Sequence, residues 1–179
     1  MKKLYYVVSL LVFVLGISFY AGKVQAATVP SVSVYRLYNP NTGEHFYTSS
    51  KVEQTQLLHI GWQDEGIGWS APTTGANVYR LYNPNVKGGD HYYTESLTEK
   101  NMLIKAGWHY DGIFWHSGGT VPVYVAYNPN AISGAHNFTT NLAEQNGLLK
   151  VGWKYGTTAW YATALGKGVP SNDCPEQSF

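Results

Sequence analysis

The sequence VYRLYNPN at residues 34–41 decides the fold, because the chain contains it three times. It returns unchanged at residues 78–85 and as VYVAYNPN at residues 123–130. After each opening come a histidine, a Gly-Trp pair whose tryptophan lies 17 residues after that histidine, and a second tryptophan 7 residues further on. This pattern accounts for all six tryptophans and indicates three tandem repeats of about 45 residues.

The first part of each repeat is predicted to be a β-hairpin. The opening segment alternates in the manner of a strand, which would place Tyr35 and Leu37 on one face. Asn-Pro-Asn is typical of a turn, and HFYT at residues 45–48 then reads as the returning strand.

The second part of each repeat is predicted to be a short helix followed by a strand or a second hairpin. Ser50 and Glu53 have the spacing of a capping box, and the aligned positions of the other repeats keep it. Gly61 lies where a left-handed helix C-cap belongs. The segment between the two tryptophans would complete the repeat, with Gly66 or Gly112 at its bend.

A single repeat of this kind cannot bury its own aromatic face, so the repeats are expected to pack on one another. We therefore predict a mainly β fold, in which three tandem repeats form a pseudo-threefold β-trefoil-like domain with a short helix in each repeat. A short, open repeat array is the alternative. The domain would span residues 27–168. Its repeats, called copies 1, 2 and 3 below, are residues 34–77, 78–122 and 123–168, and residues 169–179 form a C-terminal tail.

Residues 1–26 have the pattern of a secretory signal peptide. Lys2 and Lys3 precede an apolar stretch, and Val24-Gln25-Ala26 fits the cleavage rule, although an uncleaved membrane anchor is the alternative. Cleavage lowers Lys plus Arg from 12 to 9 against 11 acidic residues, a net charge of about −2. We expect a secreted or cell-wall-associated protein without membrane contact after cleavage. Because basic runs are lacking, nucleic acid is not expected as a partner.

The phrase YNPNTGEHFYT, followed by GW and a later W, resembles a repeat family of undetermined function. That family occurs in secreted bacterial and fungal proteins, often appended to cell-wall hydrolases such as lysozyme-like and peptidase domains. The resemblance covers residues 34 to about 161 and implies an extracellular binding role. It supplies no catalytic residues. This chain departs from the common arrangement because no separate hydrolase domain accompanies its repeats.

Charged residues vary together among the copies. Copies 1 and 2 each have an arginine and two acids at aligned positions, where copy 3 has Val125, Ala135 and Gly156. A local ion-pair cluster would explain this, since a buried charge without its partner is costly. Two polar glycan sites with a degenerate third copy are the alternative explanation. The candidate ligand-binding residues are Arg36, Glu44, His45, Glu65 and Trp69 in copy 1, and Arg80, Asp90, His91, Asp111 and Trp115 in copy 2.

The recurring tryptophans and histidines each fit more than one role. The first tryptophans, Trp62, Trp108 and Trp153, are expected in the core, whereas the second, Trp69, Trp115 and Trp160, fit either the core or stacking against a sugar. His45, His91 and His136 could be buried imidazoles, ligand donors or metal ligands. One histidine per copy is a weak metal signal, so no metal or cofactor is predicted.

The sequence has no recognisable catalytic motif. It lacks Gly-x-Ser-x-Gly and His-Glu-x-x-His, and its candidate carboxylates occur in duplicate, whereas an active site is normally a single cleft. We therefore expect a secreted, non-catalytic module that binds an extracellular or cell-wall glycan. A bacteriocin-like antagonistic protein and a cell-wall-degrading hydrolase are the alternatives.

Overall fold

The computed structural model describes residues 29–168, so the predicted signal peptide and the tail with Cys174 lie outside the described residues. Copy 1 contains β1 (Ser31–Tyr38), β2 (His45–Thr48), α1 (Lys51–His59) and β3 (Gln63–Pro72). Copy 2 contains β4 (Ala76–Asn83), β5 (Asp90–Thr94), α2 (Leu97–Lys105) and β6 (His109–Ser117). Copy 3 contains β7 (Val121–Tyr127), β8 (His136–Thr139), α3 (Leu142–Lys150), β9 (Lys154–Ala162) and β10 (Ala164–Gly168).

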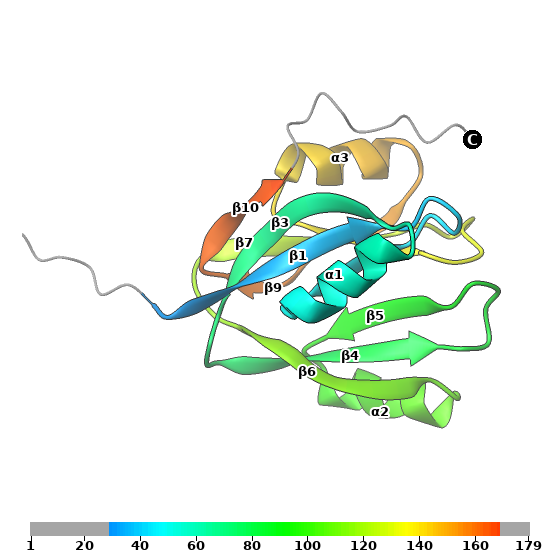
Figure 1. Cartoon of the computed structure of the whole chain (residues 1–179), viewed down its shortest axis with the longest axis horizontal. Helices are drawn as coiled ribbons and strands as arrows, with labels where there is room; N and C mark the ends of the chain where they lie inside the picture. Colours follow the sequence, from blue (N-terminus) through cyan, green and yellow to red (C-terminus); the bar gives the residue numbers. More distant parts are fainter. Residues whose placement is uncertain (1–28, 169–179) are drawn as a thin grey trace, which may run out of the picture.

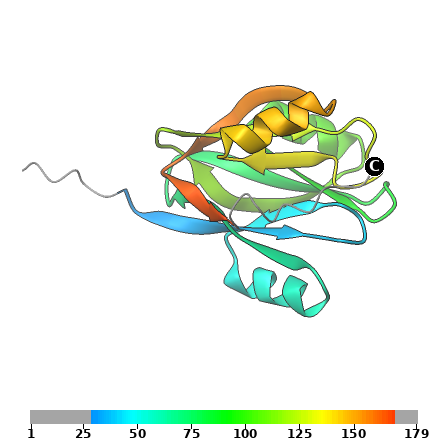
Figure 2. The same cartoon turned by 90° about the horizontal axis from the view of Figure 1, so that it is seen from above.

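The fold is mainly β, as predicted, with three small antiparallel sheets. Each sheet has the opening strand of a copy at its centre, in the orders β10-β3-β1-β2, β5-β4-β6 and β8-β7-β9. The hairpin prediction is confirmed, because Leu37 pairs with Phe46 and the whole of β2 returns along β1. The last strand, β10, crosses from copy 3 to pair with β3 of copy 1. Figures 1 and 2 show the three helices on the outside of the molecule.

The predicted alternation of the opening strand fits the structure. Tyr35 and Leu37 lie two residues apart on β1, which pairs with β2 in unbroken register. Val34 belongs to the aromatic core cluster, whereas Leu37, although also buried, does not. The pairing of β1 with β3 shifts register between Val34 and Tyr35 and again between Tyr35 and Leu37. The extra residues of these bulges lie in β3, so the period of two is kept in β1.

The helix N-termini form only half of the predicted capping box. The Ser50 side chain accepts a hydrogen bond from the Glu53 backbone N–H at 3.2 Å, as expected. The Ser50 N–H, however, donates to Thr48 Oγ1 at 2.9 Å instead of to the Glu53 carboxylate. The aligned threonines of copies 2 and 3 accept the same hydrogen bond from the N-cap N–H. The helix glutamates are therefore free to bind elsewhere.

The helix C-termini end as predicted. Gly61, Gly107 and Gly152 have φ of 99°, 94° and 100°, the left-handed conformation that glycine adopts without a steric penalty. In copy 1 the Trp62 N–H donates to Leu57 O at 3.1 Å, which completes the cap. None of the helices within residues 29–168 is long and apolar enough to cross a membrane.

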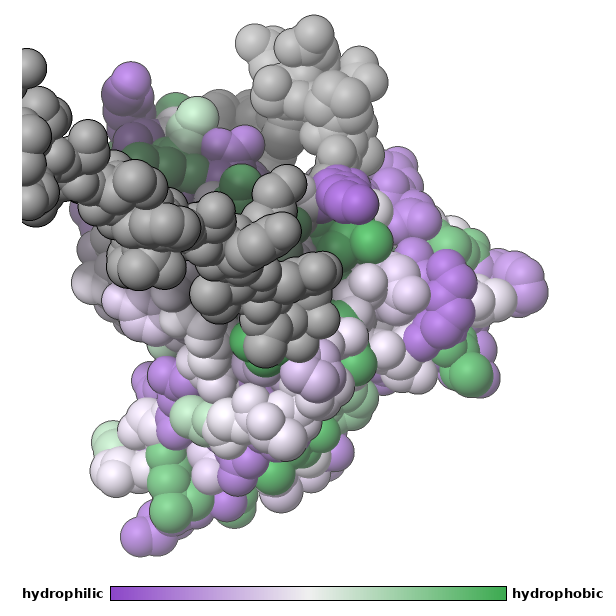
Figure 3. Space-filling model, turned by 90° about the vertical axis from the view of Figure 1, so that its left-hand side faces the viewer, coloured by the Kyte–Doolittle hydropathy of each residue, from purple (hydrophilic) through white to green (hydrophobic). Residues whose placement is uncertain are grey.

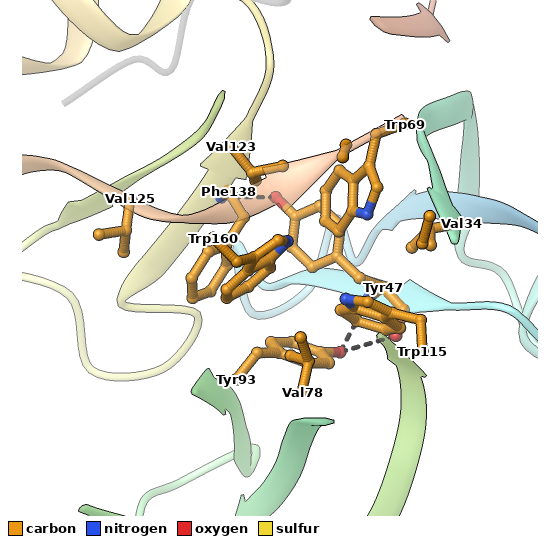
Figure 4. Packing of buried hydrophobic residues seen from close by; sticks show 12 residues of the cluster. Val34, Tyr47, Trp69, Val78, Tyr93, Trp115, Val123, Val125, Phe138 and Trp160 are labelled. Atoms are coloured by element: carbon orange, nitrogen blue, oxygen red, sulfur yellow. Dashed lines mark hydrogen bonds between the residues drawn. The ribbon is translucent and has the colours of Figure 1, made fainter. Parts of the chain in front are cut away.

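The core is a double layer of aromatic rings from all three copies (Figure 4). Trp69, Trp115 and Trp160 contact one another pairwise, with ring centroids 5.6, 5.8 and 6.0 Å apart. Beside them, Tyr47, Tyr93 and Phe138 meet edge to face, with centroids 5.6 to 5.7 Å apart. Each ring of the second layer stacks on the tryptophan of its own copy. No copy can bury these rings without the other two.

The Asn-Pro-Asn turns of different copies also lie against one another. Ser133 Oγ donates to Gly89 O, which joins the turns of copies 3 and 2. Gly134, at φ 63°, approaches copy 1 so closely that a Cβ there would lie 2.4 Å from the Glu44 Cα. A side chain at this position would force the two copies apart.

Candidate functional site

The structure places Trp69 and Trp115 inside the aromatic core. They are 0% and 2% exposed, so neither offers a ring face to a ligand. We therefore remove both from the candidate binding residues. The physical reason is that three copies need a common apolar contact, and the second tryptophan provides it. The first tryptophans are expected in the core, but they lie outside the shared aromatic cluster. Trp153 is buried, whereas Trp108 and Trp62, which packs edge-on against Phe46, are half-buried.

Arg80 links copies 1 and 2. Its Nη1 and Nη2 donate to the two carboxylate oxygens of Glu53 at 2.9 and 3.0 Å, and its Nε donates to Asp111 at 3.0 Å. The guanidinium carbon lies 3.4 Å from the ring centroid of Phe114 and 4.9 Å from that of Phe46. Bidentate pairing and aromatic stacking are the two geometries that favour arginine over lysine.

Arg36 makes the equivalent link between copies 1 and 3. Its Nε donates to Glu65 at 2.7 Å, and its Nη1 lies 2.8 Å from the Glu144 carboxylate. His45 Nε2 approaches the same Glu65 oxygen at 3.5 Å. Both arginines therefore bind one acid of their own copy and one helix glutamate of a neighbouring copy.

These contacts set the pKa values of the charged groups. Burial by itself raises the pKa of Glu65, but the hydrogen bond from His45 and the charge of Arg36 outweigh it and lower the pKa to about 2. Burial also opposes ionisation of Glu53, yet its bonds to Arg80 and Thr48 lower its pKa below the ordinary value. The carboxylates of Glu53 and Glu65 are thus held in the charged form.

A second set of contacts runs from the acid that precedes the repeat histidine in copies 1 and 2 to the histidine of the next copy. Glu44 Oε1 accepts from the His91 backbone N–H at 2.9 Å and lies 2.6 Å from His91 Nδ1. Asp90 is one methylene shorter and stays 3.8 Å from His136 Nδ1. In copy 3 the aligned residue is Ala135, which has no carboxylate to offer to His45 of copy 1. Among residues 29–168, the buried His45 Nδ1 has no hydrogen-bond partner.

His91 and His136 therefore belong to the contacts between copies, whereas the polar contact of His45 is with Glu65 of its own copy. All three histidines are largely buried. They are 9–19% exposed at their side chains, and each lies beside a tyrosine ring of its own copy. Within the described residues, no group of three His, Cys, Asp or Glu side chains could hold a metal ion.

The hydroxyls of the second aromatic layer add a third set of contacts. Tyr93 OH donates to Tyr47 O and accepts from Tyr47 N, both at 2.9 Å. Tyr47 OH accepts from Phe138 N at 2.9 Å. Phe138 has no hydroxyl with which to continue the pattern back to copy 2.

Two pairs of tyrosines lie on the outer surface. Tyr110 is 43% exposed and packs on Tyr79 at 6.1 Å, with Lys100 Nζ 4.7 and 5.0 Å from the two ring centroids. Tyr155 is 63% exposed and stacks on Tyr127 at 5.3 Å with an interplanar angle of 22°. Tyr110 and Tyr155 occupy the same position, two residues after the Gly-Trp tryptophan. Sequence reasoning missed them because copy 1 has Asp64 there.

Sequence reasoning also missed the partners of the arginines. Glu53 and Glu144 were assigned only to helix caps, although their carboxylates bind Arg80 and Arg36. The available signal was that copy 3 keeps this glutamate, as Glu144, although it lacks the arginine. Because capping does not require a carboxylate, its retention indicated a partner outside copy 3.

Three β-β-α-β segments share one aromatic core, and the chain is mainly β with three small antiparallel sheets. The chain belongs to the DUF5648 family, described as a domain of unknown function, whose family model matches residues 33–163. No curated protein and no solved structure gives a significant match.

Proposed function

We propose that this protein is a secreted, non-catalytic module that binds an extracellular or cell-wall glycan. The observation that carries the proposal is the pair of exposed aromatic surfaces, Tyr79 with Tyr110 and Tyr127 with Tyr155. An open phenol ring can stack on the C–H face of a sugar, and neighbouring polar groups can bind its hydroxyls. Lys100 provides such a donor at the first surface.

The proposed binding surface replaces the earlier candidate residues for a physical reason. Arg36, Arg80 and their acids already bind one another, so their hydrogen-bonding capacity is used within the protein. On the face shown in Figure 3, apolar side chains occur as scattered groups among polar ones. Isolated aromatic groups on a polar surface suit a hydrated ligand better than they suit a large protein interface.

A pseudo-threefold, β-trefoil-like arrangement of the copies is part of the proposal. The shared strand order of the three sheets and the pairwise contacts of Trp69, Trp115 and Trp160 support it. Tyr110 and Tyr155 occupy aligned positions but pack on different partners, Tyr110 on Tyr79 at 62° and Tyr155 on Tyr127 at 22°. They would provide two distinct aromatic contacts on one domain. Two weak sites on one polymer increase the overall affinity through effective concentration.

We propose that the protein is not catalytic because of the ionisation of its partly buried carboxylates. A glycosidase needs a protonated acid beside an ionised partner. Glu53 and Glu65 both have a lowered pKa and both bind arginine, which is the opposite of a general acid. Secretion is proposed from the signal-peptide pattern of residues 1–26.

The test uses purified protein beginning at Ala27, insoluble cell walls and an array of wall and extracellular glycans. We expect co-sedimentation with at least one polymer, weakened about tenfold by Tyr110→Ala or Tyr155→Ala, because each removes one stacking ring. Tyr161→Ala is the matched control, since Tyr161 is 48% exposed on the same strand as Tyr155. Failure to bind any glycan, or equal loss in the control, would reject the proposal. Growth inhibition of other bacteria or dye release from labelled peptidoglycan would favour the alternatives.

A further inference from the structure

The contact between copies 2 and 3 differs from the other two contacts between copies. We call it the 2–3 interface and define it by Tyr92, Glu95 and Glu99 of copy 2 and Val125, His136 and Ala159 of copy 3. The other two interfaces each bind a guanidinium between a helix glutamate and a strand acid. They show what the aligned residues do when a cation is present.

The 2–3 interface keeps the receptor for a guanidinium but lacks the guanidinium itself. Glu99 aligns with Glu53, and Tyr92 aligns with Phe46, the ring beneath Arg80. Val125 stands in the position of Arg80. Ala159 stands in the position of Phe114, which covers the other face of that guanidinium at 3.4 Å. Both large groups are thus replaced by small ones.

The Glu99 carboxylate is positioned as in the other two interfaces. It accepts from Thr94 Oγ1 at 2.5 Å and from Tyr92 OH at 3.2 Å. The aligned Glu144 accepts from Thr139 Oγ1 at 2.6 Å in the same way and also binds Arg36. Among residues 29–168, Glu99 makes no ion pair, so its charge is oriented but not neutralised.

A second acid at this interface increases the negative charge. Glu95 aligns with Ser49 and Thr140, whose hydroxyls donate across their interfaces to Phe114 O and Gly68 O. An ionised glutamate cannot donate a hydrogen bond in this way. The substitution therefore removes a contact between copies and adds a carboxylate to the copy 2 side of this interface.

Unpartnered polar atoms lie beside the same residues. Asp90, 6% exposed, has a buried Oδ1 with no hydrogen-bond partner in the described structure, and the same holds for His136 Nδ1. The His136 ring lies 4.6 Å from that of Tyr92, whose hydroxyl binds Glu99. Buried polar atoms without partners are uncommon in proteins. An unpartnered Nδ1 also occurs at His45, in the interface that holds Arg36, so the atom specific to the 2–3 interface is the acceptor Asp90 Oδ1.

We propose that the 2–3 interface binds the guanidinium group of an arginine side chain on a peptide or protein partner. The arginine would bind Glu99 and stack on Tyr92, as Arg80 binds Glu53 and stacks on Phe46 within the molecule. The interface can be reached from solvent, since Glu53 and Glu144 retain 27% and 21% side-chain exposure even beside their arginines. This site is separate from the Tyr110 surface. It adjoins the Tyr155 surface, because the His136 ring lies 5.1 Å from that of Tyr127, but binding of the arginine does not require a glycan.

The first experiment titrates ¹⁵N-labelled protein with acetyl-Gly-Arg-Gly-amide and with the same peptide carrying citrulline, which has the shape of arginine without its charge. We expect saturable shifts centred on Glu99 and Tyr92 for arginine, and binding about tenfold weaker for citrulline, because a charge-assisted bond is lost. Equal binding of both peptides, or shifts elsewhere on the molecule, would overturn the proposal.

Variants separate the site from the rest of the fold. Glu99→Gln keeps an oxygen for Thr94 and Tyr92 and should weaken arginine binding about tenfold. The matched control is Glu53→Gln, which alters the same position in the interface already occupied by Arg80 and should leave peptide binding unchanged. Val125→Arg should block the peptide by supplying an internal guanidinium. Unchanged binding by Glu99→Gln would overturn the proposal.

A third arm tests the source of the cation. The lysine peptide and chitosan oligomers, which carry primary ammonium groups, are titrated under the same conditions. We expect both to bind more weakly than the arginine peptide, because an ammonium cannot form the planar bidentate pair. Glu99-dependent binding of chitosan that exceeds that of arginine would overturn the peptide proposal in favour of an amino sugar. Wall binding by Tyr110→Ala is measured in a separate assay, and its result tests the glycan proposal and not the arginine site.

Discussion

Arg80 at the centre of β4 binds both carboxylate oxygens of Glu53, the third residue of α1, so one side chain joins the middle strand of copy 2 to the helix of copy 1. Arg36 joins Glu144 in the same way. The copies are thus held together by buried ion pairs around an aromatic core. The contact between copies 2 and 3 is the exception.

Removing the Arg80 charge should destabilise the protein strongly. Arg80→Met keeps the alkyl stem but leaves Glu53 and Asp111 without a cation in a largely buried site. We expect the free energy of unfolding to fall by about 3 kcal/mol in urea titrations followed by tryptophan fluorescence. Lys87→Met, in the exposed β4–β5 turn, should change it by less than about 0.5 kcal/mol. Equal effects of the two variants would mean that the ion pair contributes nothing net.

Glu65 should make stability depend on acidic pH. Its pKa is lowered from 4.5 to about 2 in the folded protein, so the unfolded state binds a proton first as the pH falls. The stabilisation is complete above pH 4.5 and is lost as the pH falls through about 2. At neutral pH, Glu65→Gln should be less stable by about 2–3 kcal/mol, and this difference should shrink steadily below pH 4.5. A difference that does not vary with pH would contradict the ion-pair account.

Phe138 lacks the hydroxyl that its aligned residues use to bind a neighbouring copy. Phe138→Tyr should place a hydroxyl next to the backbone of Tyr93, as Tyr93 OH lies next to the backbone of Tyr47. We expect a gain of about 1 kcal/mol in the free energy of unfolding, measured in guanidinium chloride. The reverse change, Tyr93→Phe, should cost about 1–3 kcal/mol because two buried backbone groups lose their partner. A destabilised Phe138→Tyr would show that the core has no room for the oxygen.

The sequence predicted the local elements well and the contacts between copies poorly. The His45–Thr48 strand, the Ser50 N-cap and the left-handed glycine after each helix follow from local rules, and the structure confirms them. The glutamate half of the capping box does not form. The bulges beside Tyr35 and the pairing of Glu53 with the next copy depend on neighbours that are distant in the sequence. The common loss of the charged residues from copy 3 predicted an ion-pair cluster, but it did not show that the cluster crosses between copies.

Tyr155 offers a way to separate folding from binding. Its φ of 75° is left-handed, and it is the one non-glycine residue with positive φ in the described part of the chain. For a bulky side chain this conformation costs about 1–2 kcal/mol, while stacking on Tyr127 returns about 0.5–1.5 kcal/mol. Tyr155→Gly should therefore change the free energy of unfolding by less than about 1 kcal/mol, whereas Tyr110→Gly, which relieves no such strain, should cost more than 1 kcal/mol. If Tyr155→Gly keeps its stability and loses glycan binding, the strained ring serves the ligand and not the fold. If it loses stability as Tyr110→Gly does, Tyr155 is part of the packing and the glycan surface reduces to Tyr110.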